Sequence, residues 1–321
     1  MTEIFSATTS EVAHIASVLR AIGSVSDVAA ITISDQGLRV SVDNGTHSCQ
    51  AHLFLMDKLF VNYVYNPRGE EEEEQDGSEQ LLTVHVSLKA INQCLRMFSS
   101  SAPSGSQSSG SMRASDAMKS TSEESGKSGG GGKLVTKSIT CRFSYSGPGH
   151  PFLLYFKEGR NLSTLCEFTT YEDYGALDMI ELDLDNIVQK IIIKGQYLED
   201  AIGELESLGT EVVTVRASSL VAPHFSLASQ GDMGESMLSF PNERSILETF
   251  VVETDHVPAG QNVTVANSYQ YNLIKMSRPA LTIASRVSLR CDDNGFMSLQ
   301  SMVELGDGRH SFIDFRFRPN E

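Results

Sequence analysis

Two segments in the first half of the chain place their apolar residues at helical spacing. The first starts at Ser10, a residue type that caps helix N-termini. Its apolar side chains fall on one stripe, formed by Val12, Ile15, Leu19 and Ile22. The second segment has an equivalent stripe, formed by Leu88, Ile91, Leu95 and Phe98. The pattern therefore predicts helices over residues 10–22 and 87–98.

Alternating apolar and polar residues surround both helices and predict strands. The predicted strands of the first half cover residues 29–34, 38–43, 48–55, 81–86, 134–145, 151–157 and 161–170. Two connections carry a glycine after a polar residue, at Gln36-Gly37 and Asn44-Gly45. Such pairs are typical of hairpin turns, so neighbouring strands are expected to be antiparallel.

The second half of the chain runs through a similar order of elements. A strand over 187–193 precedes a helix over 195–208. Further strands are predicted at 211–217, 223–229, 235–240 and 246–253, and, after a short helix near 268–276, at 281–291, 295–305 and 309–318. A strand, a helix and three strands thus recur twice in each half. This order predicts an α+β fold of two similar domains, each with two helices against antiparallel sheets.

Composition indicates the boundaries of these domains. Residues 99–133 are rich in serine and glycine and nearly free of large apolar side chains, so we expect a disordered insertion in a loop. The acidic run over 70–76 is expected to form a solvated loop, because like charges repel one another. The predicted organisation is an N-terminal domain over 1–170, a connector over 171–179 and a C-terminal domain over 180–321.

Charge and cysteine content narrow the classes of function. A formal net charge of −16 argues against a simple nucleic-acid-binding protein, although affinity for DNA depends on where the cations lie. No apolar run approaches the roughly 20 residues of a membrane span, so no membrane partner is expected. The first residues lack the features of a signal peptide, and the five cysteines include no CxxC pair. These features predict an intracellular protein with reduced thiols and no zinc site.

No arrangement of residues predicts an active site. The acidic residues that a metal-dependent nuclease could use are Asp173, Asp178, Glu181, Asp183 and Asp185. Between 180 and 184, however, acidic and apolar residues alternate, which is typical of a half-buried surface strand. The histidines lack HxH and HExxH spacing, and the sequence has no phosphate-binding loop or GxSxG motif. We therefore expect no catalytic residues, no metal and no cofactor.

The ordered series of elements resembles the PCNA-like sliding-clamp family. The likeness is carried by GLRVSVDNGTHSCQAHLFL at 37–55, HPFLLYFKEG at 150–159 and GQYLEDAIGELESLGTEVVTVRAS at 195–218. The most specific segment, VSLRCDDNGFMSLQSMVELGDGRHSFIDFRFRP at 287–319, is similar to the C-terminal hairpins of Rad-one-type subunits of the heterotrimeric DNA-damage checkpoint clamp. The resemblance implies a ring of three subunits around duplex DNA, with helices lining the hole and sheets outside.

Cations outside the apolar stripes are the candidate DNA-facing residues. They are Arg20 on the first helix, Lys89 and Arg96 on the second, and Lys275 and Arg278 at the end of the fourth. Such side chains attract phosphates without reading base sequence. Ordinary solvated positions are the alternative interpretation. Acidic residues on the third helix, including Glu199 and Glu206, argue against a strongly basic lining.

The resemblance also implies two surfaces that contact other proteins. In the clamp family a hydrophobic pocket beside the connector receives partner peptides, and its wall is assigned here to Val42, Met179, Ile180 and Phe317. Core burial is the alternative for each of these residues. Clamp subunits pair through strands equivalent to 161–169 and 235–240, where the contacting side chains are assigned to Leu162, Leu165, Met237 and Leu238. Exposed strand edges need partners, and ring closure supplies them.

The function that the resemblance implies is that of a subunit of a heterotrimeric DNA-damage checkpoint clamp in the nucleus. Its expected partners are two other clamp subunits, double-stranded DNA, an ATP-dependent clamp loader, and repair and checkpoint proteins. Two alternatives stay open, a replicative homotrimeric clamp and a 3'–5' DNA exonuclease. The serine- and glycine-rich insertion and the uneven charge of the helices count against the homotrimer.

Overall fold

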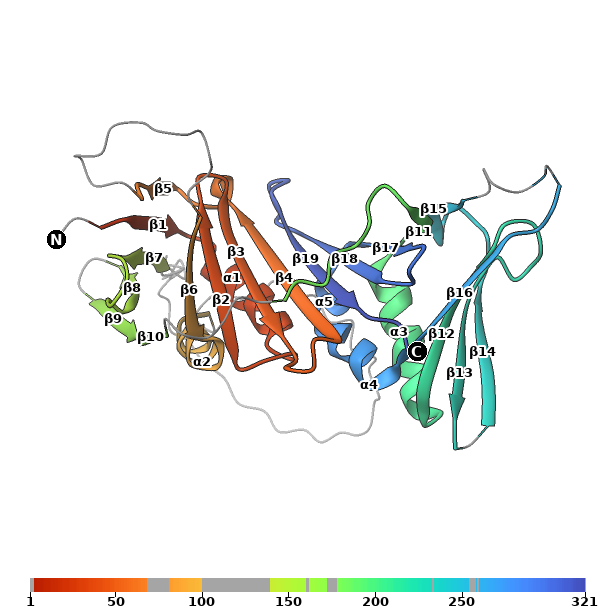
Figure 1. Cartoon of the computed structure of the whole chain (residues 1–321). Coiled ribbons are helices and arrows are strands. Elements are labelled where there is room, and N and C mark those ends of the chain that lie inside the picture. The colour runs from red at the N-terminus through yellow and green to blue at the C-terminus, as the bar shows by residue number, and fades with distance from the viewer. Residues whose placement is uncertain are drawn as a thin grey trace, which may run out of the picture.

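The computed structural model describes residues 3–67, 81–99, 139–159, 162–171, 178–232, 234–253, 258 and 260–320. Figure 1 shows an elongated molecule in which three β-sheets follow one another along its length. The N-terminus lies at one end, and near the end of the sequence the Asn320 N–H donates to the Ser268 carbonyl oxygen at 2.7 Å. Helices and antiparallel sheets combine in the α+β arrangement that the sequence pattern predicts.

A ten-stranded sheet forms the middle of the molecule. Its strands, in spatial order, are β10 (Thr170–Tyr171), β6 (Leu82–Ser87), β2 (Val28–Ser34), β3 (Gly37–Asp43), β4 (Cys49–Met56), β19 (His310–Phe317), β18 (Met297–Glu304), β17 (Arg286–Asp292), β11 (Ile187–Ile193) and β15 (Leu247–Val252). β4 and β19 are antiparallel, with Phe54 opposite Phe312 and Cys49 opposite Phe317. Strands from both halves of the sequence therefore form one continuous sheet.

Two smaller sheets flank the central one, one at each end of the molecule (Figure 1). The first contains, in order, β5 (Asn62–Tyr65), β1 (Phe5–Thr9), β7 (Ile139–Tyr145), β8 (Phe152–Glu158) and β9 (Leu162–Phe168). The second contains, in order, β14 (Gly234–Phe240), β13 (Phe225–Gly231), β12 (Thr210–Ser218) and β16 (Thr264–Gln270). Within the described residues, β9 pairs only with β8 and β14 only with β13, so both are edge strands.

The helices pack against the central sheet and against both smaller sheets. They are α1 (Val12–Ile22), α2 (Leu88–Ser99), α3 (Gly195–Ser207), α4 (Tyr271–Ile274) and α5 (Arg278–Ile283), with 3-10 helices η1 at Asp57–Leu59 and η2 at Lys275–Ser277. His14 Nε2 on α1 lies 2.8 Å from Ser311 Oγ on β19, which identifies the face that α1 covers. Ile313 and Phe315 share that face and are fully buried. Burying each such side chain stabilises the fold by about 1.5–3 kcal/mol.

The start of α1 differs from the prediction. The helix begins at Val12, and Glu11 occupies the N-cap position without a capping side-chain hydrogen bond. Ser10 lies one residue too early to cap the helix, and its hydroxyl contacts the Glu11 carboxylate instead. The Glu11 N–H donates to Thr9 Oγ1 at 3.0 Å. The predicted capping role of Ser10 is therefore wrong.

The last helical region also differs from the prediction. Residues 264–270 form β16 beside β12, where the pattern predicts a helix from 268. The helix that follows is broken into α4, η2 and α5, and Pro279 occupies the first turn of α5. Proline is tolerated there because the first N–H groups of a helix have no intrahelical acceptor. The strand predicted over 281–291 starts only at Arg286.

Several predicted segments fall outside the described residues. They are the serine- and glycine-rich insertion beyond residue 99, the acidic run over 70–76 and connector residues 172–177. The division into domains at 170 and 180 stays a prediction. Within the described part of the chain, no helix is long and apolar enough to cross a membrane.

Candidate nucleic-acid interface

The helices of the two halves form a single layer. α1 packs on α2 of its own half and on α5 of the other half, and α5 packs on α3. The loop after α1 is tied to η2 by a hydrogen bond in which Ser24 Oγ donates to the Met276 carbonyl oxygen at 2.7 Å. The order α2, α1, α5, α3 therefore places all candidate DNA-facing cations on one side of the molecule.

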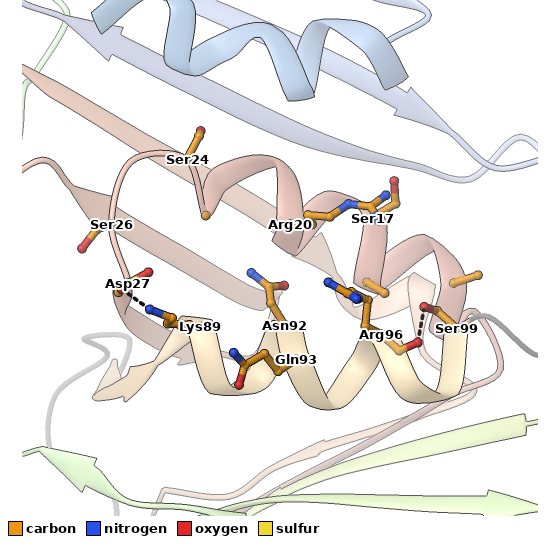
Figure 2. A pocket seen from close by; sticks show the side chains of 13 residues that line it. Ser17, Arg20, Ser24, Ser26, Asp27, Lys89, Asn92, Gln93, Arg96 and Ser99 are labelled. Carbon is orange, nitrogen blue, oxygen red and sulfur yellow. Dashed lines mark hydrogen bonds and ion pairs between the residues drawn. The ribbon is translucent and has the colours of Figure 1, made fainter. Parts of the chain in front are cut away.

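Helices α1 and α2 enclose a groove of about 370 Å³ (Figure 2). Asn92 Nδ2 on α2 donates to the Leu19 carbonyl oxygen at 3.3 Å and holds the two helices together. Gly23 follows the last turn of α1 at this contact. A Cβ atom at Gly23 would lie 3.0 Å from Asn92 Nδ2, so the close approach of the helices favours glycine.

Three of the predicted cations, Arg20, Lys89 and Arg96, line this groove. Figure 2 shows Arg20 on α1 and Arg96 on α2, with their side chains in the space between the two helices. Lys89 Nζ lies 3.2 Å from Asp27 Oδ2, but both side chains are more than half exposed, so solvent weakens their attraction. Within the described residues, no carboxylate pairs with Arg20 or Arg96. The groove therefore carries excess positive charge.

Lys275 and Arg278 lie in the same layer, but glutamates on α3 compensate their positive charge. Arg278 Nη2 lies 2.6 Å from Glu199 Oε1, and Arg278 Nη1 lies 2.6 Å from Glu206 Oε2. Lys275 also pairs with Glu206, and this hydrogen bond lowers the pKa of the Glu206 carboxyl group. The hydrogen bond to Glu199 raises the pKa of Arg278. Because α3 exposes Glu204 as well, this part of the layer has no excess positive charge.

The structure does not bring together the four residues assigned to a partner-peptide pocket. Val42 and Phe317 are 1% and 0% exposed and lie on the helix-covered face of the central sheet, with Ala51 and Phe315. Ile180 is also buried, but it lies on the opposite face of that sheet. Met179 is half-buried. The four residues therefore do not share one surface, and burial in the core accounts for Val42 and Phe317.

Sequence reasoning missed the two residues that fix the end of the connector. Gln50 on β4 donates from Nε2 to the Asp178 carbonyl oxygen at 2.6 Å and accepts from the Ile180 N–H at 2.7 Å. Its partner in the neighbouring strand, Arg316, donates from Nη1 to the Ile180 carbonyl oxygen at 2.7 Å. Residues 178–180 thus cross the β4–β19 junction. A buried glutamine in the apolar strand CQAHLFLM is the sequence signal for this contact.

The two predicted pairing strands are edge strands at opposite ends of the molecule (Figure 1). β9 exposes Leu162 and Leu165, which are 56% and 49% accessible. β14 exposes Met237, which is 51% accessible, whereas Leu238 is half-buried and packs against the core. Three of the four assigned side chains are therefore free to contact a neighbouring chain.

Four of the acidic residues considered as nuclease ligands, Asp178, Glu181, Asp183 and Asp185, lie in the described part of the chain, whereas Asp173 lies outside it. Within the described residues, no group of three histidine, cysteine, aspartate or glutamate side chains is arranged to hold a metal ion. Asp183 accepts hydrogen bonds from Asn186 Nδ2 at 2.8 Å and from the Asp185 N–H at 3.1 Å. These bonds lower the pKa of Asp183 and stabilise a turn. Residues 180–184 are irregular, so the strand interpretation was wrong.

Two solved structures with a similar fold are chains of PCNA proteins. The chain superimposes on the proliferating cellular nuclear antigen of Entamoeba histolytica with a TM-score of 0.63 and 12% sequence identity, over 100% of both chains. It is also similar to a chain of the PCNA2–PCNA3 complex of Sulfolobus tokodaii, with a TM-score of 0.62 and 13% identity, over 98% of this chain and 99% of that one. The architecture is therefore the PCNA-like sliding-clamp fold.

Relatives with higher sequence identity are checkpoint proteins. The DNA damage checkpoint control protein rad1 of Schizosaccharomyces pombe is 29% identical over 316 residues, which cover 98% of this chain and 86% of the relative. The cell cycle checkpoint protein RAD1 of Mus musculus is 27% identical over 285 residues, which cover 89% and 81%. The family described as Repair protein Rad1/Rec1/Rad17 matches residues 4–303. The chain therefore belongs to the Rad1/Rec1/Rad17 family and is a Rad1-type checkpoint clamp subunit.

Proposed function

We propose that this chain forms one third of a heterotrimeric ring that encircles duplex DNA in the nucleus and acts in DNA-damage checkpoint signalling and repair. The observation that carries the proposal is the positive groove between α1 and α2. It lies in the helical layer of a chain whose formal net charge is −16. Unpaired cations that gather in one groove of an acidic protein are best explained by a negatively charged partner at that place.

The groove fits loose contact with DNA phosphates better than tight, sequence-specific binding. Arg20 and Arg96 extend from two different helices, and the groove between them is open to solvent. Cations in such positions attract phosphates without reading bases, and the attraction weakens as salt rises. A closed ring stays on DNA through its topology. Modest positive charge on one half of the layer is therefore sufficient.

The two edge strands support a ring with two different neighbours. β9 has the sequence LSTLCEF and β14 the sequence GESMLSF, so each carries one carboxylate and neither carries a cation. If β9 of one copy paired with β14 of another, Glu167 and Glu235 would add repulsion with no compensating ion pair. Partner edges with cations would remove this cost. Two other clamp subunits are thus the proposed neighbours, in preference to further copies of this chain.

In this proposal the chain is a scaffold and not an enzyme. A closed ring must open before it can encircle circular DNA, so an ATP-dependent clamp loader is a proposed partner. Repair and checkpoint proteins are proposed to bind the assembled ring. A 3'–5' exonuclease is the weaker candidate function, because Asp183, one of the carboxylates that would bind its metal ion, forms hydrogen bonds within a turn.

Charge reversal in the groove tests this proposal. The double variant Arg20→Glu, Arg96→Glu, assembled with its two partner subunits, should be retained on DNA roughly tenfold less well at low ionic strength, and the difference should shrink as salt rises. Both side chains are exposed, so assembly should be unchanged. Retention can be measured by the dissociation rate of the fluorescently labelled ring from circular DNA.

A matched control separates the groove from net charge. Lys157 on β8 and Lys190 on β11 are exposed cations outside the helical layer. The double variant Lys157→Glu, Lys190→Glu makes the same change in total charge and should be retained like the wild type. Equal losses of DNA retention in the two double variants would show that the groove has no special role.

A further inference from the structure

Two thiols meet between helix α2 and the edge strand β9. Cys94 Sγ lies 3.1 Å from Cys166 Sγ, although the residues are separated by 72 positions in the sequence. All five cysteines of the chain lie in the described residues, and Cys166 is the only one that is not buried. The pair thus combines a partly exposed cysteine with a buried cysteine in direct contact.

Neighbouring residues hold the two thiols in place. Phe98, one turn after Cys94 on α2, stacks on Phe156 of β8 with a distance of 4.0 Å between ring centroids. β8 is the hydrogen-bonded neighbour of β9, and Cys166 lies opposite Leu154. A disulfide requires the two sulfur atoms to approach by roughly another 1 Å, which is a small change for two side chains already in contact.

We propose that Cys94 and Cys166 form a reversible intrachain disulfide when the protein meets a hydroperoxide, and that this bond ties the edge strand β9 to helix α2. The remaining three cysteines lack this combination. Cys49 and Cys291 are buried away from the pair, and Cys141 is fully buried on β7. The site is thus a redox modification site made by one pair of side chains.

The oxidation of the two thiols takes place in two steps. The Cys166 thiol loses its proton to solvent, and its thiolate attacks one oxygen of the hydroperoxide as the O–O bond breaks. Cys166 becomes a sulfenic acid, and the leaving hydroxide or alkoxide takes a proton from solvent and departs as water or an alcohol. Cys94 then attacks the sulfenic sulfur, forms the S–S bond and expels hydroxide, which takes the Cys94 proton and leaves as water. The two thiols together lose two electrons to the peroxide. A thiol reductant reverses the bond by exchange.

The surroundings of the two thiols decide which cysteine reacts first. Burial and the contact with Cys166 raise the pKa of the Cys94 thiol to about 12, so Cys94 is a poor first nucleophile. The contact with Cys166 nevertheless gives Cys94 a high effective concentration as the second nucleophile. Burial, followed by the nearby thiols of Cys94 and Cys166, also raises the pKa of Cys141, which leaves Cys141 passive.

The bond would connect two functional surfaces. β9 is an edge strand in the proposed ring contact, and α2 carries Lys89 and Arg96 on its other side. A covalent link between them restrains the fraying of the edge strand. The disulfide chemistry does not depend on the proposed ring, so it can be tested on the full-length chain alone.

The experiment treats the full-length, reduced chain with hydrogen peroxide, blocks the remaining thiols and maps peptides by mass spectrometry. The expected product is a cross-linked pair of peptides containing Cys94 and Cys166, lighter by two hydrogen atoms and separated again by dithiothreitol. Amide hydrogen exchange in residues 162–168 should be slower in the oxidised protein. Cys166→Ser, at a partly exposed position that tolerates the change, should abolish the cross-link.

Control variants make the assignment specific. Cys141→Ser and Cys291→Ser should retain the cross-link in full. A disulfide that includes Cys141, or a dimer of two chains linked through Cys166, would overturn the proposal. So would irreversible oxidation of Cys166 to a sulfinic acid without any cross-link, since the second thiol would then have failed to intervene.

Discussion

His52 shows how a single buried residue makes the stability of this fold depend on pH. It lies on the face of the central sheet opposite the helices, and its Nδ1 is 2.9 Å from Ser41 Oγ. Nε2 has no hydrogen-bond partner within the described residues. The charged groups around the ring are Arg316, Asp314, Arg39 and Asp43. Burial is the main reason that the pKa of His52 falls to about 4.

This shift predicts a loss of stability in mild acid. Between the unfolded pKa of 6.5 and the folded pKa of about 4, the unfolded chain binds more protons than the folded one. The free energy of unfolding is therefore unaffected by His52 titration above pH 6.5 and decreases as the pH falls below that value. At pH 5 the loss in the free energy of unfolding should be about 2 kcal/mol. Urea unfolding at pH 7.5 and at pH 5 measures it.

Two variants isolate the histidine in this experiment. His52→Asn keeps a polar group beside Ser41 but cannot titrate, so it should lose less stability than the wild type over the same pH interval. His310→Asn, at an exposed position, should keep the wild-type pH dependence. If His52→Asn and the wild type lose equal stability, another group causes the pH dependence.

Among the elements, those with a strong local pattern could be predicted from the sequence. The apolar stripes of α1 and α2 fix both helices to within two residues, because each stripe must face the core. β16 could not be predicted in the same way. Its sequence TVANSYQ alternates weakly, and it becomes a strand through pairing with β12, a contact between distant segments.

The exposure of two candidate cations could be predicted from the sequence. Arg20 and Arg96 lie outside the apolar stripes and prove to be exposed in the groove. The compensation of Arg278 by Glu199 could not be seen, because it depends on how α5 packs against α3. The contact of Cys94 with Cys166 was hidden for the same reason. Contacts of this kind follow from tertiary structure and leave no local pattern.

Single substitutions on the two edge strands should separate the two proposed subunit contacts. Leu165→Lys on β9 and Met237→Lys on β14 should each leave the stability of the single chain within about 0.5 kcal/mol of the wild type, because both side chains are exposed. Each variant should weaken the affinity for one partner subunit roughly tenfold and leave the other unchanged, since each edge meets a different neighbour. Analytical ultracentrifugation of each pair measures these affinities.

Leu184→Lys is the control for the edge variants. Leu184 is 67% exposed but lies outside any strand. The Leu184→Lys variant should bind both partner subunits with the affinity of the wild type. Loss of the same partner in both edge variants would contradict the assignment of two separate pairing edges.

The whole molecule combines a continuous sheet with an uneven helical layer. The central sheet crosses from one half of the sequence to the other through β4 and β19, so the pairing of two strands joins the two halves. A continuous junction of this kind suits a segment of a ring. Positive charge is concentrated between α1 and α2, whereas the cations near α3 are paired with glutamates. The chain is thus expected to contact DNA through its first half.

The central claim, that this chain closes a ring around DNA with two other subunits, is tested most directly by topology. The fluorescently labelled ring is loaded onto closed circular DNA by its clamp loader, washed at high salt and then challenged with an enzyme that cuts the circle once. The account predicts that the ring survives the wash on the circle and is lost when the DNA is cut, unless the ends are blocked by bound protein. Equal retention on cut and closed DNA, or a stable ring made of this chain alone, would contradict it.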